Sequence, residues 1–218
     1  MKTNQEKAAI KWVMLDHCDR EVTTDPIGNT VESTGGVCQT SFLSNYGNAK
    51  IADTINWRDL PTANQFNLLS DEFTIEFYIN PTSNTGQFII WLITDFTVND
   101  PRGLSLGFSN GDLVVFTKTN TSDKISFNQA YEVNKPLYVT FIANRSVASP
   151  CIELYLNGVF RSSISFSSID TASLLTGKVF KIYELGNWYP TLFDEVAVRT
   201  GRAYERTGFT PPTRPFSV

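Results

Sequence analysis

The sequence predicts an all-β protein in which two antiparallel sheets stack as a sandwich. Three observations predict this fold class. Residues 73–79, FTIEFYI, alternate between two kinds of side chain with the period of a strand. Short apolar runs are separated by clusters of Gly, Pro, Asn, Asp and Ser along the whole chain. Asn-Gly pairs with apolar flanks stand at 110–111 and 157–158, and each favours a two-residue hairpin.

The first part of the chain holds short strands and one irregular stretch. We expect strands within residues 11–18 and 35–43, with turns at 26–29 and 47–48. Residues 53–69 have a mixed pattern with a proline in it, so we expect irregular backbone there.

Residues 73–79 form the clearest strand. Their odd-numbered positions are Phe, Ile, Phe and Ile, which we expect to face the core, whereas Thr74, Glu76 and Tyr78 share the other face. Pro81 ends this strand. Residues 86–96 are nearly all apolar, as in a strand that is covered on both faces.

The later strands follow in short order. They are expected in residues 104–118, 137–145, 151–166, 179–188 and 192–198, which brings the total to about eleven to thirteen strands. Helix signals are weak. The 16 Phe and 8 Tyr residues supply a large aromatic core.

The chain is expected to form a single domain. Residues 1–9 are interpreted as a polar leader or docking arm, and residues 10–218 as one sandwich with a proline-rich C-terminal strap, residues 208–218. Pro211 and Pro212 stiffen the strap, and Phe209 and Phe216 are expected to anchor it in apolar surface.

Composition excludes several classes of protein. The net charge of −4 and the pI of about 5.1 disfavour nucleic acid as a partner. No apolar run approaches the ~18 residues of a membrane helix, so membrane insertion is not expected. Three widely spaced cysteines favour reduced, structural thiols. No signal peptide is recognised at the N-terminus, so synthesis in a cytoplasm is expected.

Seven segments carry a resemblance to a known family. They are KWVMLDHCDR, DPIGNTV, YGNAKIA, FTIEFYINP, the pair LYVTFIANR and IELYLNGV, and the closing FDEVAVRTGRAYERTGFTPPTRPF. In this order they resemble the concanavalin A-like lectin/glucanase superfamily, in the laminin-G-like jelly-roll form found in bacteriophage virion proteins. The chain departs from the family at Tyr78, where Trp is common, and in residues 53–69, which do not align.

The resemblance implies a function by analogy of fold. It implies a non-enzymatic bacteriophage virion protein, such as a capsid decoration, fibre or tail-associated protein, located on the particle. Its partners would be other virion proteins and copies of itself, together with glycans of the host surface. Two alternatives stay open: a stand-alone carbohydrate-binding module and a polysaccharide depolymerase.

The search for catalytic residues identifies none. His17 is the one histidine, and its neighbour Cys18 points to the opposite side of a strand, so the two cannot act together. Glycan hydrolysis needs two carboxylates ~5–9 Å apart in one cleft. The sequence shows no ladder of acids, although cross-strand pairing can still bring Glu76 near another acid. Asp194 and Glu195 are expected on opposite faces of a strand, one of them paired with a nearby arginine.

Binding candidates lie in loops. Trp188 and Tyr189, with Asn187 beside them, and Trp57 are candidates for stacking on sugar rings. Tyr46 and Tyr204 also lie outside the clearest strands, and packing is the competing interpretation for each of these aromatics. Asp95, Asn99 and Asp100 form an oxygen-rich cluster suited to calcium, which the resemblance also allows at the rim, although such residues commonly just form turns.

Overall fold

The computed structural model describes the backbone of part of the chain. This part comprises residues 12–16, 32–33, 38–40, 43, 46–51, 54–57, 72–82, 88–95, 102–109, 112–116, 124–127, 131–166, 179–184 and 192–217. Side chains are described for residues 15, 43, 46, 47, 72–82, 112, 131–166 and 192–217. The predicted leader, residues 1–9, lies outside this part, so the division into leader, sandwich and strap stays a prediction.

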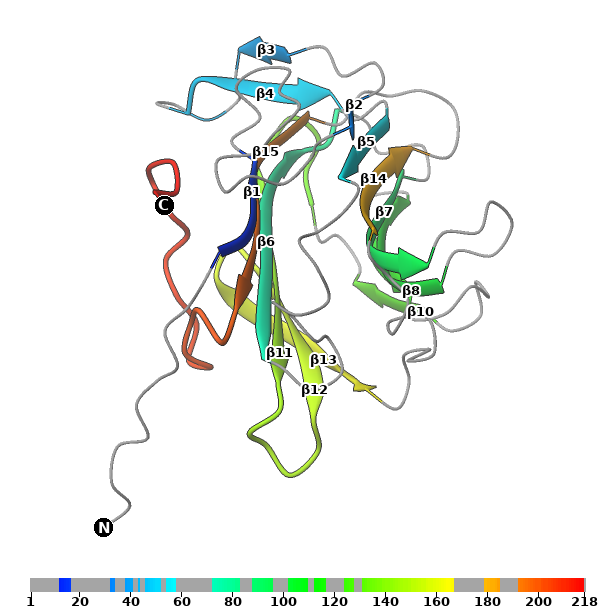
Figure 1. Ribbon diagram of the computed structural model, residues 1–218, viewed down its shortest axis with the longest axis vertical. Coiled ribbons are helices and arrows are strands. Elements are labelled where there is room, and N and C mark those ends of the chain that lie inside the picture. The colour runs from blue at the N-terminus through cyan, green and yellow to red at the C-terminus, as the bar shows by residue number, and fades with distance from the viewer. Residues whose placement is uncertain are drawn as a thin grey trace.

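Two antiparallel sheets face each other (Figure 1). The eight-stranded sheet has the order β13 (Val159–Ser165), β12 (Cys151–Leu156), β11 (Leu137–Asn144), β6 (Phe73–Asn80), β15 (Leu192–Thr200), β4 (Asn48–Ile51) and β3 (Cys38–Thr40), and β1 (Trp12–Asp16) also pairs with β15. The seven-stranded sheet has the order β10 (Lys124–Phe127), β9 (Asp112–Phe116), β8 (Arg102–Ser109), β7 (Phe88–Asp95), β14 (Val179–Glu184), β5 (Thr54–Trp57) and β2 (Glu32–Ser33). The predicted all-β sandwich is confirmed.

The described residues form fifteen strands, more than the sequence predicted. The difference comes from short strands such as β2 and β5, which have two and four residues. β5 lies within residues 53–69, so the expectation of irregular backbone there is wrong for residues 54–57. Alternation cannot be recognised over so few residues, and only pairing, of β2 with β5 and of β5 with β14, makes them strands. No helix of the described residues is long and apolar enough to cross a bilayer.

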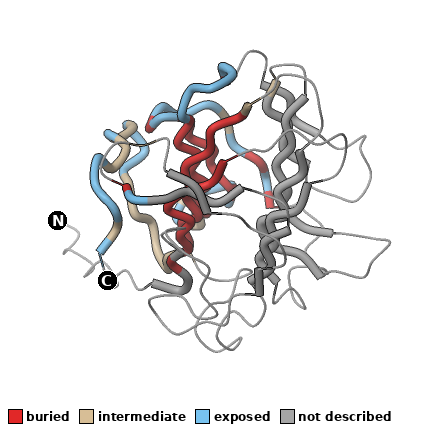
Figure 2. Tube along the Cα trace, turned by 90° about the horizontal axis from the view of Figure 1, so that it is seen from above, coloured by how far each residue is buried: buried red, intermediate tan, exposed pale blue. Residues whose placement is uncertain are grey.

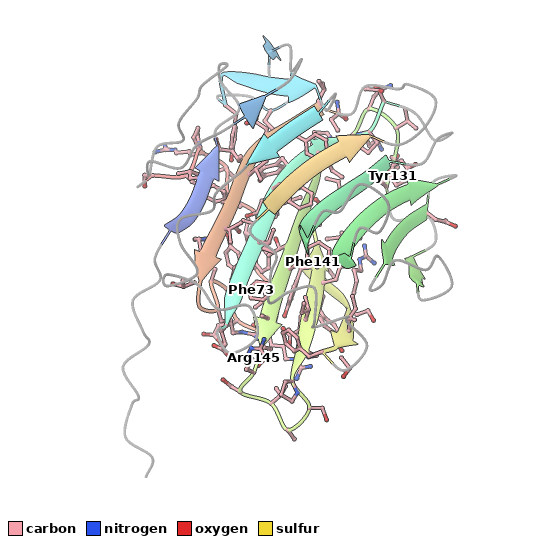
Figure 3. All side chains as sticks on the ribbon, turned by 45° about the vertical axis from the view of Figure 1, so that its right-hand side comes forward. Phe73, Tyr131, Phe141 and Arg145 are labelled. Carbon is pink, nitrogen blue, oxygen red and sulfur yellow. The ribbon has the colours of Figure 1, made fainter. Side chains whose placement is uncertain are left out.

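The core of the eight-stranded sheet follows the predicted alternation. Phe73, Ile75, Phe77 and Ile79 are all at most 1% exposed. Phe77 packs on Phe193 of β15, with ring centroids 6.2 Å apart. Figure 3 shows Phe73 and Phe141 on the neighbouring strands β6 and β11, with Arg145 just beyond the end of β11. Burying each of these large side chains contributes about 1.5–3 kcal/mol.

The other face of the same sheet is also buried, which the alternation did not indicate. Thr74 and Glu76 are 0% exposed, and Tyr78 is 7% exposed. Residues 201–217 run over this outer face, on the side away from the seven-stranded sheet (Figure 2). We call the covered face of β6, β11, β12 and β15 the strap-facing surface.

Candidate functional site

The strap-facing surface carries Glu76, the acid that cross-strand pairing was expected to bring near another, together with a second buried glutamate, Glu153. Register places Glu76 opposite Thr140, and Thr140 opposite Tyr155. Glu153 lies opposite Ile142 on the same face. Because side chains on one face of adjacent strands are neighbours, two glutamates from β6 and β12 lie on one surface with β11 between them.

Glu76 is fully buried, and both of its carboxylate oxygens have partners. Tyr138 and Tyr204 donate hydrogen bonds from their hydroxyls to Oε2, the second over 2.7 Å. Arg199, at the end of β15, forms an ion pair with Oε1. A buried carboxylate needs such partners because an unpaired charge away from water is very costly.

Glu153 is also fully buried on this surface. Asn144 Nδ2 donates to its Oε1 over 2.9 Å, and the Tyr155 hydroxyl donates to its Oε2 over 2.8 Å. Two arginines complete the site: Arg202 Nη2 lies 3.0 Å from Oε2, and Arg206 Nε lies 2.9 Å from Oε1. We call residues 199–206, which carry the three arginines, the basic segment.

The environment sets the protonation of these groups. Burial raises the pKa of Glu153, but the hydrogen bonds from Asn144, Tyr155 and Arg202 outweigh burial and hold this pKa below its ordinary value. Burial and the hydrogen bond to Glu153 raise the pKa of Tyr155 to about 12. Burial likewise raises the pKa of Tyr138 well above its ordinary value. At neutral pH, Glu153 is therefore charged and the tyrosines are neutral donors.

The environment of Glu153 favours a structural role over a role as a general acid. A general acid in glycan hydrolysis needs a raised pKa so that it carries a proton near neutral pH. Glu153 has a lowered pKa, and its two oxygens already accept four donors. What the surface can do chemically is hold the basic segment against the sheet.

The lowered pKa of Glu153 makes the free energy of unfolding depend on pH in the acidic range. The folded pKa lies below the unfolded value of about 4.3, so this contribution is complete above that pH and is lost as pH falls through the folded pKa. We expect the free energy of unfolding, measured with urea, to fall from pH 5 to pH 3. The Glu153→Gln variant should be less stable at pH 7 and show a shallower fall. An equally steep fall in that variant would contradict this assignment.

The strap meets a cluster of tyrosines beside the glutamates. Tyr46, Tyr78 and Tyr138 pack together, with Leu43, Phe209 and Phe216 against them. The hydroxyls of Tyr46 and Tyr78 both donate to the carbonyl oxygen of Pro212, over 2.7 and 2.5 Å. The anchoring expected of the two strap phenylalanines is confirmed.

Two loop aromatics considered for sugar binding serve this contact. Tyr46 is 4% exposed and binds Pro212 as described. Tyr204 stacks on Phe209 with ring centroids 3.7 Å apart and planes at 9°. These two rings are therefore packed against the strap, as the alternative to sugar stacking predicted.

The acidic pair of β15 departs from simple alternation. The register with β6 shifts between Asp194 and Ala197, and Glu195 has φ +51, so a bulge interrupts the strand. Asp194 Oδ1 accepts from the Glu195 amide over 2.9 Å, and Glu195 Oε2 accepts from the Phe216 amide over 2.8 Å. The alternation expected to place the two acids on opposite faces does not apply across a bulge. Glu195 instead holds the end of the strap.

The predicted binding residues lie mostly outside the described part. Trp57 is the last residue of β5 and Asp95 the last of β7, and only their backbones are described. Asn187, Trp188 and Tyr189, and also Asn99 and Asp100, lie outside it. The glycan and calcium sites stay predictions. Among the described side chains, no three His, Cys, Asp or Glu residues gather as metal ligands.

Sequence reasoning missed that Glu76 and Glu153 are the partners of the basic segment. One signal was present: Glu76 lies on the face of its strand opposite the core, and three arginines crowd into residues 199–206. Pairing them requires knowing that β15 lies beside β6, which alternation does not reveal.

Comparison with known proteins supports the fold. A laminin-G-type family model, described as the concanavalin A-like lectin/glucanases superfamily, matches residues 41–201. A search of curated proteins gives no match.

Among solved structures, the receptor binding domain of botulinum neurotoxin D superposes with a TM-score of 0.62 at 15% identity, covering 86% of this chain and 48% of that one. The binding domain of botulinum neurotoxin DC in complex with rat synaptotagmin II gives a TM-score of 0.57 at 18% identity, covering 86% and 47%. This chain thus spans about half the length of those domains. At such identities the likeness shows the fold alone, whereas the family match covers most of the chain. The chain belongs to the concanavalin A-like lectin/glucanases superfamily, with the jelly-roll sandwich of its laminin-G-like members.

Proposed function

We propose that this chain is a non-enzymatic structural protein of a bacteriophage particle whose lectin-like domain binds glycans of the host surface. The observation that carries the binding role is the superfamily match over residues 41–201. The neighbouring toxin domains are receptor-binding domains, which supports recognition of a cell surface as the use of this sandwich.

The strap-facing surface supports the non-enzymatic part of the proposal. Of the described acids, Glu76 and Glu153 share one face of the sheet, and both accept bonds from arginine and tyrosine beneath the basic segment. A substrate would have to displace those partners before reaching either carboxylate. This favours binding over hydrolysis.

The particle role rests on the resemblance of the closing segment, residues 193–216, to phage virion proteins. Such a particle would carry repeated copies as a decoration, fibre or tail-associated protein. Weak sugar contacts gain avidity when many copies are linked, by factors of about 10²–10⁴. A lectin-like domain with modest affinity is well suited to that use.

The glycan-binding part is tested with the purified full chain on arrays of bacterial surface polysaccharides. We expect retention that the Trp188→Ala variant loses at least tenfold. Phe160→Ala is the matched control, because Phe160 is an exposed aromatic on β13 that the proposal does not use, and its retention should be unchanged. Equal retention of wild type and Trp188→Ala would remove Trp188 from the site, and absence of retention on every glycan would overturn lectin activity.

Two further measurements separate the alternatives. Release of reducing ends from a retained polysaccharide would replace the proposal with a depolymerase. Mass spectrometry of purified phage particles should find this chain in many copies per particle. Glycan binding by a chain that no particle contains would instead make it a stand-alone carbohydrate-binding module.

A further inference from the structure

The strap is held on the sheet in an unusual way. Residues 209–217, all of them described, belong to no strand. A backbone hydrogen bond holds them, from the Phe209 amide to the Gly158 carbonyl oxygen over 3.0 Å. Side chains of the body hold them as well: Tyr46 and Tyr78 donate to the Pro212 carbonyl oxygen, and Glu195 accepts from the Phe216 amide. A segment bound largely through side chains resembles a ligand of the surface beneath it more than a strand of the sheet.

The chemistry matches recognition of proline-rich peptides. Such segments dock on aromatic surfaces whose polar groups bind the free carbonyls, because proline lacks an N–H. Here Pro212 and Pro215 have the P-x-x-P spacing, and phenylalanines stand on both sides of it. Phe209, Pro212 and Phe216 are partly buried, whereas Thr213, Arg214 and Pro215 between them are exposed.

The connection between the strap and the body is a glycine, Gly208. Gly208 has φ +97, which L residues rarely adopt, and a Cβ placed there would lie 2.9 Å from the Gly158 carbonyl oxygen. Glycine at this point can absorb a large change in backbone direction. The three arginines of the basic segment before it form ion pairs with Glu76 and Glu153, and these ion pairs do not involve the strap, so they can hold the basic segment when the strap leaves.

We propose that the tyrosine cluster (Tyr46, Tyr78 and Tyr138) is a docking site that accepts the strap of a second copy of this chain as well as its own. A strap from another copy makes the same contacts, since exchange of an identical element needs no new interface. Within one chain the strap has an effective concentration in the millimolar range. A strap from another copy competes with it only when the local concentration of copies reaches that range, so exchange is favoured where copies are crowded together. This inference goes beyond glycan recognition and stands independently of it.

The first test uses a labelled peptide of residues 207–218 and the full chain. In the strap variant, Phe209→Ala with Phe216→Ala, the chain's own strap competes poorly. We expect saturable binding of the peptide to this variant by fluorescence anisotropy, at least tenfold tighter than to wild type. A peptide carrying the same two alanines should bind at least tenfold more weakly. Absence of saturable binding to a strap variant that keeps its β-sheet circular dichroism would overturn the proposal.

The second test asks for exchange between whole chains. The tyrosine variant, Tyr46→Phe with Tyr78→Phe, keeps its strap but loses the two donors to Pro212. Mixed with the strap variant, it should form a heterodimer by native mass spectrometry, whereas each variant alone stays monomeric. A mixture that contains monomers alone at several hundred micromolar would overturn exchange between copies. If the strap variant fails to fold, Phe216→Ala alone, which keeps the stack of Tyr204 on Phe209, is compared in both assays by the same criteria.

Discussion

Replacing Glu76 with glutamine is expected to destabilise the protein by about 3–5 kcal/mol, the range for removing one charge of a buried ion pair. The substitution keeps the size of the side chain but removes the charge that balances Arg199, whose side chain is only 14% exposed. It also weakens the acceptor of the Tyr138 and Tyr204 hydroxyls. The free energy of unfolding from urea denaturation at pH 7 measures this loss.

The control for Glu76→Gln is a glutamate in an exposed ion pair. Glu132 pairs with Lys135 three residues on, and the two side chains are 70% and 64% exposed. Glu132→Gln makes the same chemical change, yet solvent screens the pair, so its effect should stay within about 0.5 kcal/mol. If both substitutions cost the same, the buried network does not stabilise the fold as described.

Gly158→Ala should be the second most damaging of these changes, and it should also loosen the strap. A Cβ at Gly158 would lie 1.8 Å from the carbonyl oxygen of Phe209, a backbone atom that no side-chain rotation can move aside. The residue also has φ +76, which costs an L residue about 1–2 kcal/mol. Crowding of the strap adds about 1–3 kcal/mol.

Gly47→Ala separates the two causes. Gly47 is exposed and has a φ of +73, close to that of Gly158, so its replacement measures the backbone strain alone. Gly158→Ala should cost more than this control. Hydrogen exchange should in addition become faster at the Phe209 amide, which donates to the Gly158 carbonyl over 3.0 Å. Unchanged protection of that amide would show that the strap does not depend on close approach at Gly158.

Much of the fold could be predicted because strands carry local signals. The alternation in residues 73–79 identified β6 and its core face, and all four core-facing residues are buried. Asn157-Gly158 identified the turn between β12 and β13, and both residues have positive φ there. Short strands such as β2 and β5 carried no such signal, since two to four residues become a strand only by pairing with a neighbour.

The candidate site was less predictable for a different reason. A strand pattern says which face of β6 carries Glu76, but it does not say what covers that face. The position of Tyr46 outside the clear strands likewise could not decide between sugar stacking and packing. Its hydroxyl binds Pro212, which is 166 residues away in the sequence, and no local pattern shows that contact.

The sequence by itself determined the longer strands and the Asn157-Gly158 turn, because periodicity and Asn-Gly turns act over a few residues. Only the tertiary structure decided which charges meet. Glu76 and Arg199 are 123 residues apart and become partners because the sheet places β15 beside β6. A buried charge is stable only next to an opposite one, so the order of strands selects its partner.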